Sequence, residues 1–129
     1  MIIIGTKLKI SDNSGAKIAK CIKIIKKKKY ISIGNIILVC LKKFFNRKKV
    51  KKRIIYIGLI VSIKYWVFRL DGTFIKFFSN NILLFNKQFK FIGTRIYGLI
   101  FKEVKINNLK EKKYKNYFHK IITYSSFMI

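Results

Sequence analysis

Residues 7–24 read KLKISDNSGAKIAKCIKI, and this stretch decides the class of fold. Lysine alternates with apolar residues over residues 7–10, which is the period of a β-strand. Residues 11–15 hold Ser, Asp, Asn and Gly, the residue types that favour turns. The alternation then resumes, so the stretch predicts two strands joined by a turn. On the second strand we expect Ile18, Ile22 and Ile24 to share one face and Lys17, Cys21 and Lys23 to share the other.

Further short strands follow from the pattern of the next segments. Residues 35–41 are apolar on both faces, which predicts a buried strand, and residues 53–64 predict the central strand. Residues 65–70 and 73–78 flank Asp71-Gly72. That pair accepts the positive φ of a type I′ turn and indicates a hairpin.

The C-terminal third continues the pattern with shorter elements. We expect a strand over residues 82–85, a short helix over 99–104 and another short element over 118–128. Several short strands with turns at near-regular spacing, and no long helix, predict a mainly β protein built as a small β-barrel. No linker divides the chain, so we expect one domain over residues 1–129, with residues 99–129 as a C-terminal extension.

The net charge points to a polyanionic partner. The chain carries 30 Lys and Arg against 4 Asp and Glu, a formal charge of +26, yet 51% of its 129 residues are hydrophobic. That content can build a core, whereas a disordered basic tail would lack one. Because a compact state with this charge repels itself, we expect a folded module bound to nucleic acid. The longest apolar run, 54–63, is about half the ~20 residues of a membrane helix, so no membrane partner is expected.

Two basic segments are candidate contacts with RNA phosphates. Residues 42–53 hold eight basic residues in twelve and predict an exposed loop, and residues 26–30 predict a basic turn. The glycine-bracketed segment 93–98 predicts a tight loop that brings Thr94 and the forked guanidinium of Arg95 to phosphate. From the two basic segments the candidates are Lys26, Lys27, Lys28, Lys29, Arg47, Lys48, Lys49, Lys51, Lys52 and Arg53.

Catalysis and metal binding have little support in the sequence. Asp12 and Asp71 both sit in turn signatures, which explains them without chemistry. His119, the only histidine, has no acidic or Cys neighbour to orient it. Cys21 and Cys40 are two ligands at most, too few for a structural zinc site, and we expect free thiols. We therefore expect no enzyme activity, no metal, no cofactor and no small-molecule substrate.

Residue usage suggests where the gene resides. Lysine outnumbers arginine 26 to 4 and proline is absent, although arginine is the better bidentate ligand for phosphate. AT-rich codons specify Lys, Ile, Asn, Phe and Tyr, so this bias favours an organelle genome, and equally an AT-rich parasite or endosymbiont. No targeting segment is apparent at the N-terminus. We expect an organelle-encoded mitochondrial protein, with a plastid as the alternative.

Four motifs, in this order and spacing, resemble the family of the universal large-subunit ribosomal protein fourteen. They are DNSGAK at 12–17, CIKI at 21–24, RLDGTFIKF at 69–77 and GTRIYG at 93–98. The likeness extends over essentially the whole chain. Residues 106–116 are longer than the family's connection at this place.

The resemblance implies a fold, partners and further site residues. The fold would be a five-stranded β-barrel, of OB-like or SH3-like size, with short C-terminal helical elements. The partners would be large-subunit rRNA, ribosomal proteins of the three and nineteen types, and small-subunit rRNA at an intersubunit bridge, with no catalytic activity. The resemblance supports Lys49, Lys51, Lys52 and Arg95 as RNA contacts and adds Lys17, Lys23, Arg69, Lys76, Lys90 and Lys102.

Two other functions remain open at this point. The first is a free protein with an OB-like barrel that binds single-stranded nucleic acid. The second is a basic protein of a membrane surface, which the spacing of lysines at two rather than at helical intervals disfavours.

Overall fold

The computed structural model describes residues 2–25, 31–45, 49–104 and 115–129. The side chains of residues 115–119 and 126 are also outside the description. The predicted basic turn at 26–30 and most of the longer connection at 106–116 lie outside the described residues. So do six candidate RNA contacts: Lys26, Lys27, Lys28, Lys29, Arg47 and Lys48.

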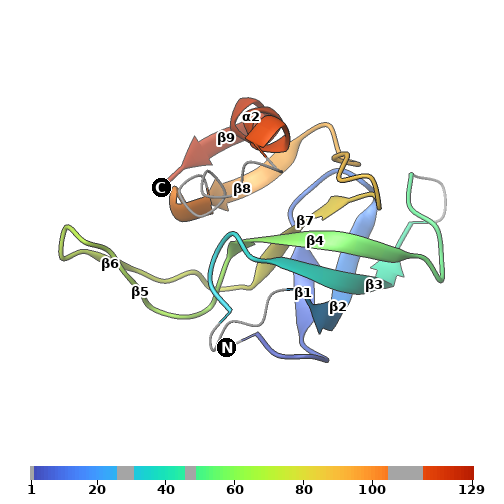
Figure 1. Cartoon of the computed structure of the whole chain (residues 1–129), viewed down its shortest axis with the longest axis horizontal. Coiled ribbons are helices and arrows are strands. Elements are labelled where there is room, and N and C mark those ends of the chain that lie inside the picture. Colours follow the sequence, from blue (N-terminus) through green and yellow to red (C-terminus); the bar gives the residue numbers. More distant parts are fainter. Residues whose placement is uncertain (1, 26–30, 46–48, 105–114) are drawn as a thin grey trace.

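Five strands close into a barrel, which confirms the expected fold class (Figure 1). Their order around the barrel is β1-β2-β3-β4-β7. The strands β1 and β7 are parallel, and the other neighbours are antiparallel. The barrel strands are β1 (Lys7–Ile10), β2 (Ala16–Ile24), β3 (Ile36–Phe44), β4 (Ile55–Ser62) and β7 (Asn81–Phe85).

The predicted central strand is confirmed as β4, and it is the most buried element of the barrel. From Tyr56 to Ser62 every residue is buried. A Cβ at Gly58 would lie 3.2 Å from Ile82 and 3.3 Å from both Ile37 and Val39. The glycine therefore leaves room for side chains of β3 and β7 to pack against β4, because protein interiors are packed to near-crystalline density.

The predicted faces of β2 are wrong. Cys21 is buried together with Ala19, whereas Ile22 is 38% exposed. The pairing of β2 with β3 shifts register at three places, and each β-bulge resets the inward and outward alternation. Small side chains therefore occupy the interior of β2. Burial also raises the pKa of the Cys21 thiol, and both cysteines are free, as expected.

Two expectations around β3 need correction. The strand is not buried on both faces, since Ile37 and Val39 are buried and Ile36 and Leu38 are only partly so. The exposed loop predicted for 42–53 is also shorter than expected. The strand runs to Phe44, and Val50 is only 1% exposed.

The hairpin predicted at Asp71-Gly72 is confirmed, but its turn type is not. The strands β5 (Val67–Phe68) and β6 (Phe74–Ile75) pair with each other and form an arm that extends away from the barrel (Figure 1). Among the two central residues only Gly72 has a positive φ, 81°. The Gly72 N–H donates to the Arg69 carbonyl and the Arg69 N–H to that of Thr73. This is the three-residue loop with a glycine bulge rather than a type I′ turn.

The C-terminal part forms a second layer beside the barrel (Figure 1). The helix predicted at 99–104 is mostly wrong, because Ile96–Ile100 is the strand β8, and helical conformation begins only at Glu103. The element predicted at 118–128 is the end of helix α2 (Lys115–Tyr124) followed by strand β9 (Ser125–Met128). The strands β8 and β9 are parallel, a pairing that depends on tertiary contacts.

Candidate nucleic-acid interface

The two most specific motifs of the sequence meet in space. Asn13, in the turn after β1, donates from Nδ2 to Thr94 Oγ1 at 2.8 Å. Its Oδ1 accepts the backbone N–H groups of Thr94 at 2.7 Å and Arg95 at 3.1 Å. The Asn13 N–H in turn donates to the Arg95 carbonyl. A single side chain thus holds the 93–98 loop against the 12–17 turn across more than eighty positions.

Asp12 stabilises the contact between the 12–17 turn and the 93–98 loop, which we call the joint. Its Oδ1 accepts the Ser14 N–H at 2.8 Å and its Oδ2 accepts the Leu84 N–H of β7 at 2.9 Å. Both carboxylate oxygens therefore serve buried backbone donors, which would be costly to leave unpaired. Burial raises the pKa of Asp12, although the hydrogen bonds from Ser14 and Leu84 lower it in part.

Gly93 is required at this joint for space. A Cβ there would lie 3.0 Å from Asp12 Cβ, 3.0 Å from the Phe91 ring and 3.1 Å from Asn13 Oδ1. The close packing holds the backbone of the loop and leaves the side chains of Thr94 and Arg95 exposed. The loop therefore presents Arg95 outward on a fixed support.

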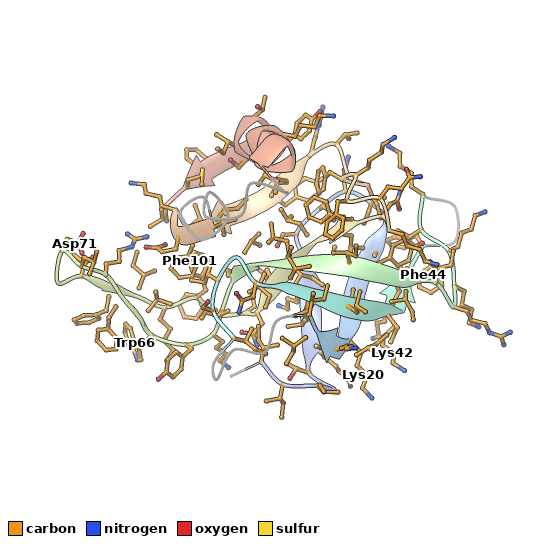
Figure 2. The ribbon with its side chains drawn as sticks, in the orientation of Figure 1. Lys20, Lys42, Phe44, Trp66, Asp71 and Phe101 are labelled. Atoms are coloured by element: carbon orange, nitrogen blue, oxygen red, sulfur yellow. The ribbon has the colours of Figure 1, made fainter. Side chains whose placement is uncertain are left out.

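Lysines cover the outer surface of the first three strands. Lys7 of β1 pairs directly with Lys20 of β2, and both are exposed. Lys20 pairs with Cys40 of β3, and Figure 2 shows Lys20 and Lys42 on the same side of the barrel. We call the exposed lysines of these strands the basic face: Lys7, Lys9, Lys17, Lys20, Lys23, Lys42 and Lys43.

Three members of the basic face, Lys7, Lys9 and Lys20, were not among the predicted RNA contacts. Lys42 and Lys43 were predicted only as part of the basic segment 42–53. The signal for Lys7 and Lys9 is their alternation with Leu8 and Ile10, which places them on the outer side of a half-buried strand. Lys42 and Lys43 are consecutive, so alternation does not explain why both are exposed; the pairing of β2 with β3 shifts register beside them. Directly opposed like charges destabilise a strand pair, so the repulsion between Lys7 and Lys20 lowers the stability of the free protein.

A second basic surface lines a groove of about 1000 Å³ at the β3–β4 end of the barrel. Lys49, Lys51, Arg53 and Lys87 contribute to its walls, with Asn86 and Gln88 beside them. The Lys51 N–H donates to the Tyr56 hydroxyl at 2.9 Å, which ties this segment to β4. The structure thus brings together three of the predicted contacts and adds Lys87.

Arg69 is used inside the protein. Its Nε donates to Glu103 Oε1 at 2.6 Å and its Nη2 to Oε2 at 3.2 Å. A further bond joins Nη2 to the backbone oxygen of Ile129 at 2.7 Å. Most of the guanidinium's donors are therefore engaged, and any phosphate contact falls to those that remain.

The other predicted contacts are exposed, and two of them, Lys17 and Lys23, belong to the basic face. Lys76 lies with its Nζ 5.2 Å from the centre of the Trp66 ring, and Lys17 lies 4.5 Å from that of Phe45, both as cation–π pairs. The remaining exposed candidates are Lys23, Lys52, Lys90 and Lys102.

The described carboxylates leave this charge unbalanced. Asp12 serves the joint and Glu103 holds Arg69. Asp71 accepts the N–H and hydroxyl of Thr73 through one oxygen, in the turn role expected for it. Over the described ranges no group of three or more His, Cys, Asp or Glu side chains could hold a metal ion, and no helix is long and apolar enough to cross a membrane.

Comparison with known proteins agrees with this arrangement. Residues 1–128 match the sequence model of the family described as ribosomal protein L14p/L23e. The chain is also 44% identical, over 107 residues, to the large ribosomal subunit protein uL14 of Carsonella ruddii (strain PV). That alignment covers 81% of this chain and 88% of the relative. The chain therefore belongs to the L14p/L23e family and is a structural, non-enzymatic protein of the large ribosomal subunit.

Proposed function

We propose that the basic face and the basic groove bind large-subunit rRNA, and that the 93–98 loop adds Arg95 to this contact. The observation that carries the proposal is the direct pairing of Lys7 with Lys20 on adjacent strands. Like charges in this position are unfavourable unless an anion lies between or over them. A phosphate backbone supplies that anion along the whole face.

The mechanism is electrostatic. The barrel holds the lysines at fixed positions, they neutralise phosphates, and condensed counterions are released to solvent. Lysine serves as a point charge here, whereas Arg95 can bond phosphate with two parallel N–H groups. Such contacts fix position and orientation on RNA and carry no sequence information themselves.

Salt dependence of binding tests this proposal. Affinity for a large-subunit rRNA fragment should fall linearly on a log–log plot, with a slope of about −0.9 for each duplex phosphate contacted. Replacing both Lys7 and Lys20 by Ala should reduce the magnitude of the slope, while Lys64→Ala, at an exposed lysine outside the basic face and the proposed contacts, serves as the control. A slope that is the same in the wild-type protein and the double variant would contradict the assignment of the basic face.

The loop makes a separate contribution. Arg95→Ala should weaken incorporation into the large subunit more than replacing any single lysine among Lys26–Lys29, because Asn13 fixes the backbone at Arg95 and the forked guanidinium can bond phosphate through two N–H groups. Quantifying each variant in purified large subunits measures this. Equal effects would mean that the 93–98 loop acts only as a turn.

Finer parts of the role rest on the resemblance and on residue usage. The chain acts as one domain, with residues 99–129 as an extension. It packs beside ribosomal proteins of the three and nineteen types and reaches small-subunit rRNA at a bridge. Chemical footprinting of both rRNAs, with and without the chain, tests the bridge, since protection confined to large-subunit rRNA would exclude it.

The compartment is proposed from residue usage. The AT-rich bias supports a mitochondrial ribosome, while the relative named above is bacterial. Fractionating cells and locating the chain among ribosomes of the mitochondrion, plastid and cytosol decides between them. Gradients at high salt also separate this role from that of a free single-strand binder, because a ribosomal protein stays with the particle.

A further inference from the structure

The arm has two faces of different character, and only one of them is used inside the protein. Val67 pairs with Ile75 across the hairpin, and both are partly buried against the core. Phe68 pairs with Phe74, and these are 75% and 58% exposed. Since directly opposed residues share a face of a strand pair, one face of the arm rests on the body and the other faces solvent.

Contacts on the inner side hold the arm in place. Phe77, at its base, packs on Phe101 with ring centres 4.6 Å apart. Arg69 makes its two-pronged bond to Glu103. A two-stranded hairpin is marginally stable by itself, so these anchors keep the outer face in one arrangement.

The outer face is an ordered aromatic cluster. We call Trp66, Phe68 and Phe74 the aromatic face. The Trp66 and Phe74 rings lie 5.4 Å apart at 80°, and the Phe68 and Phe74 rings lie 5.9 Å apart at 57°. In Figure 2 Trp66 points to the side of the arm away from Phe101. Leu70 at the tip and Phe78 beyond β6 are almost fully exposed.

We propose that the aromatic face is a docking surface for an apolar groove on another protein of the large subunit. The pre-ordered aromatic cluster is the type of anchor that dominates protein–protein interfaces. Its charge also differs from the rest of the chain. Between Tyr65 and Ile75 the only charged side chains are Arg69 and Asp71, which have opposite signs.

Ring geometry argues against RNA as the occupant. Successive bases stack on ring faces that are parallel to them, whereas these rings stand at steep angles and cover each other. Lys76 lies over the ring of Trp66. Of the cations on the arm, Arg69 is engaged by Glu103 and Ile129 and Lys76 by the Trp66 ring, so few free donors remain there for phosphate.

A second copy of this chain is an equally poor occupant. Two chains that each carry a formal charge of +26 repel strongly. The inference rests on membership of the large subunit, and it does not depend on the proposed rRNA contacts of the basic face.

Site-specific crosslinking in purified large subunits tests the occupant. A benzophenone amino acid at position 68, activated by light, should give a product that protease destroys and RNase leaves intact, joined to another subunit protein. The same label at Ile3, which is 60% exposed at the far N-terminal end of the chain, is the matched control and should not label that protein. A crosslink to rRNA, a crosslinked pair of this chain, or no crosslink would each overturn the proposal.

Paired substitutions provide an independent measurement. Phe68→Ser with Phe74→Ser should lower retention of the chain in salt-washed subunits by about tenfold or more, and leave its affinity for naked rRNA unchanged. Ile3→Ser with Ile4→Ser should alter neither. Loss of naked-rRNA affinity in the Phe68/Phe74 variant would show that the aromatic face binds RNA and overturn the proposal. Loss of rRNA affinity in the Lys7/Lys20 variant alone tests the proposed function instead.

Discussion

The basic face and the arm leave different groups without partners in the free chain. On the basic face, Lys7 and Lys20 lie directly opposite each other with no described carboxylate beside them. On the arm, aromatic rings with few charges around them face solvent. Each region therefore has groups that only a binding partner can satisfy, and the two partners must differ in chemistry. The basic face needs anions, and the arm needs an apolar surface.

The two regions also differ in how they are fixed. The 12–17 turn, which includes Lys17 of the basic face, is held by buried hydrogen bonds to Asp12. The arm depends on surface contacts through Arg69 and Phe77.

The largest effect is expected at Asp12. Asp12→Asn leaves one oxygen to serve the Ser14 and Leu84 N–H groups and places an NH₂ group against one of them, which should cost about 1–3 kcal/mol of unfolding free energy. Urea unfolding measures it. Asp71→Asn on the arm is the matched control, because a single oxygen of Asp71 accepts both bonds from Thr73 and Asn keeps such an oxygen. Equal losses in the two variants would contradict the difference.

A smaller effect is expected at Arg69. The ion pair with Glu103 is partly exposed, at 18% and 22% for the two side chains, so solvent screening keeps its contribution to the free energy of unfolding small. Arg69→Ala should loosen the arm more than it destabilises the barrel. Trp66 is the only tryptophan, so its fluorescence anisotropy reports on the arm directly. Unchanged anisotropy would show that Phe77 and Phe101 hold the arm without the ion pair.

The basic face should respond with opposite signs in stability and binding. Lys20→Glu replaces repulsion from Lys7 by attraction, so the free protein should gain about 0.2–1 kcal/mol at low salt, and rRNA affinity should fall. Unfolding and binding measured in the same buffer give both values. Lys90→Glu, away from this face, should not stabilise the protein. A loss of stability in Lys20→Glu would contradict the repulsion between Lys7 and Lys20 on which the proposed function rests.

The most subtle test is the titration of the two aspartates. Burial raises the pKa of Asp12 above 3.8, so its contribution to stability is fully present below the unfolded pKa and lost as the pH rises through the folded pKa. Hydrogen bonds from Thr73 lower the pKa of Asp71, so its contribution is present above the unfolded pKa and lost as the pH falls through the folded pKa. Carboxyl-carbon NMR titration measures both. Midpoints in the reverse order would refute this assignment.

Sequence periodicity predicted the strands of the barrel better than their faces. The strand over 53–64 and the hairpin at Asp71-Gly72 followed from local pattern and turn chemistry. The side of β2 that faces inward did not, because bulges set by pairing with β3 shift the alternation. The strand β8 was expected as a helix, since its pairing with β9 is a tertiary contact between short segments.

The site was predictable only in part for the same reason. The basic residues of 42–53 were visible as a charge run, and three of them line the groove. The meeting of Asn13 with Thr94 joins positions 81 residues apart, which no local pattern encodes. The internal role of Arg69 likewise depends on Glu103, which lies 34 positions away.

The parallel pairing of β1 with β7 has a consequence for synthesis of the chain. The first strand can complete its pairing only when residues 81 and 82 are available, and the joint at Asn13 needs residues 94 and 95. Closing loops of this length costs conformational entropy before the contacts between distant residues form. Folding should therefore be slow compared with local helix formation. Much of the chain must therefore leave the translating ribosome before the barrel closes, and until then the lysines and core strands are open to other molecules.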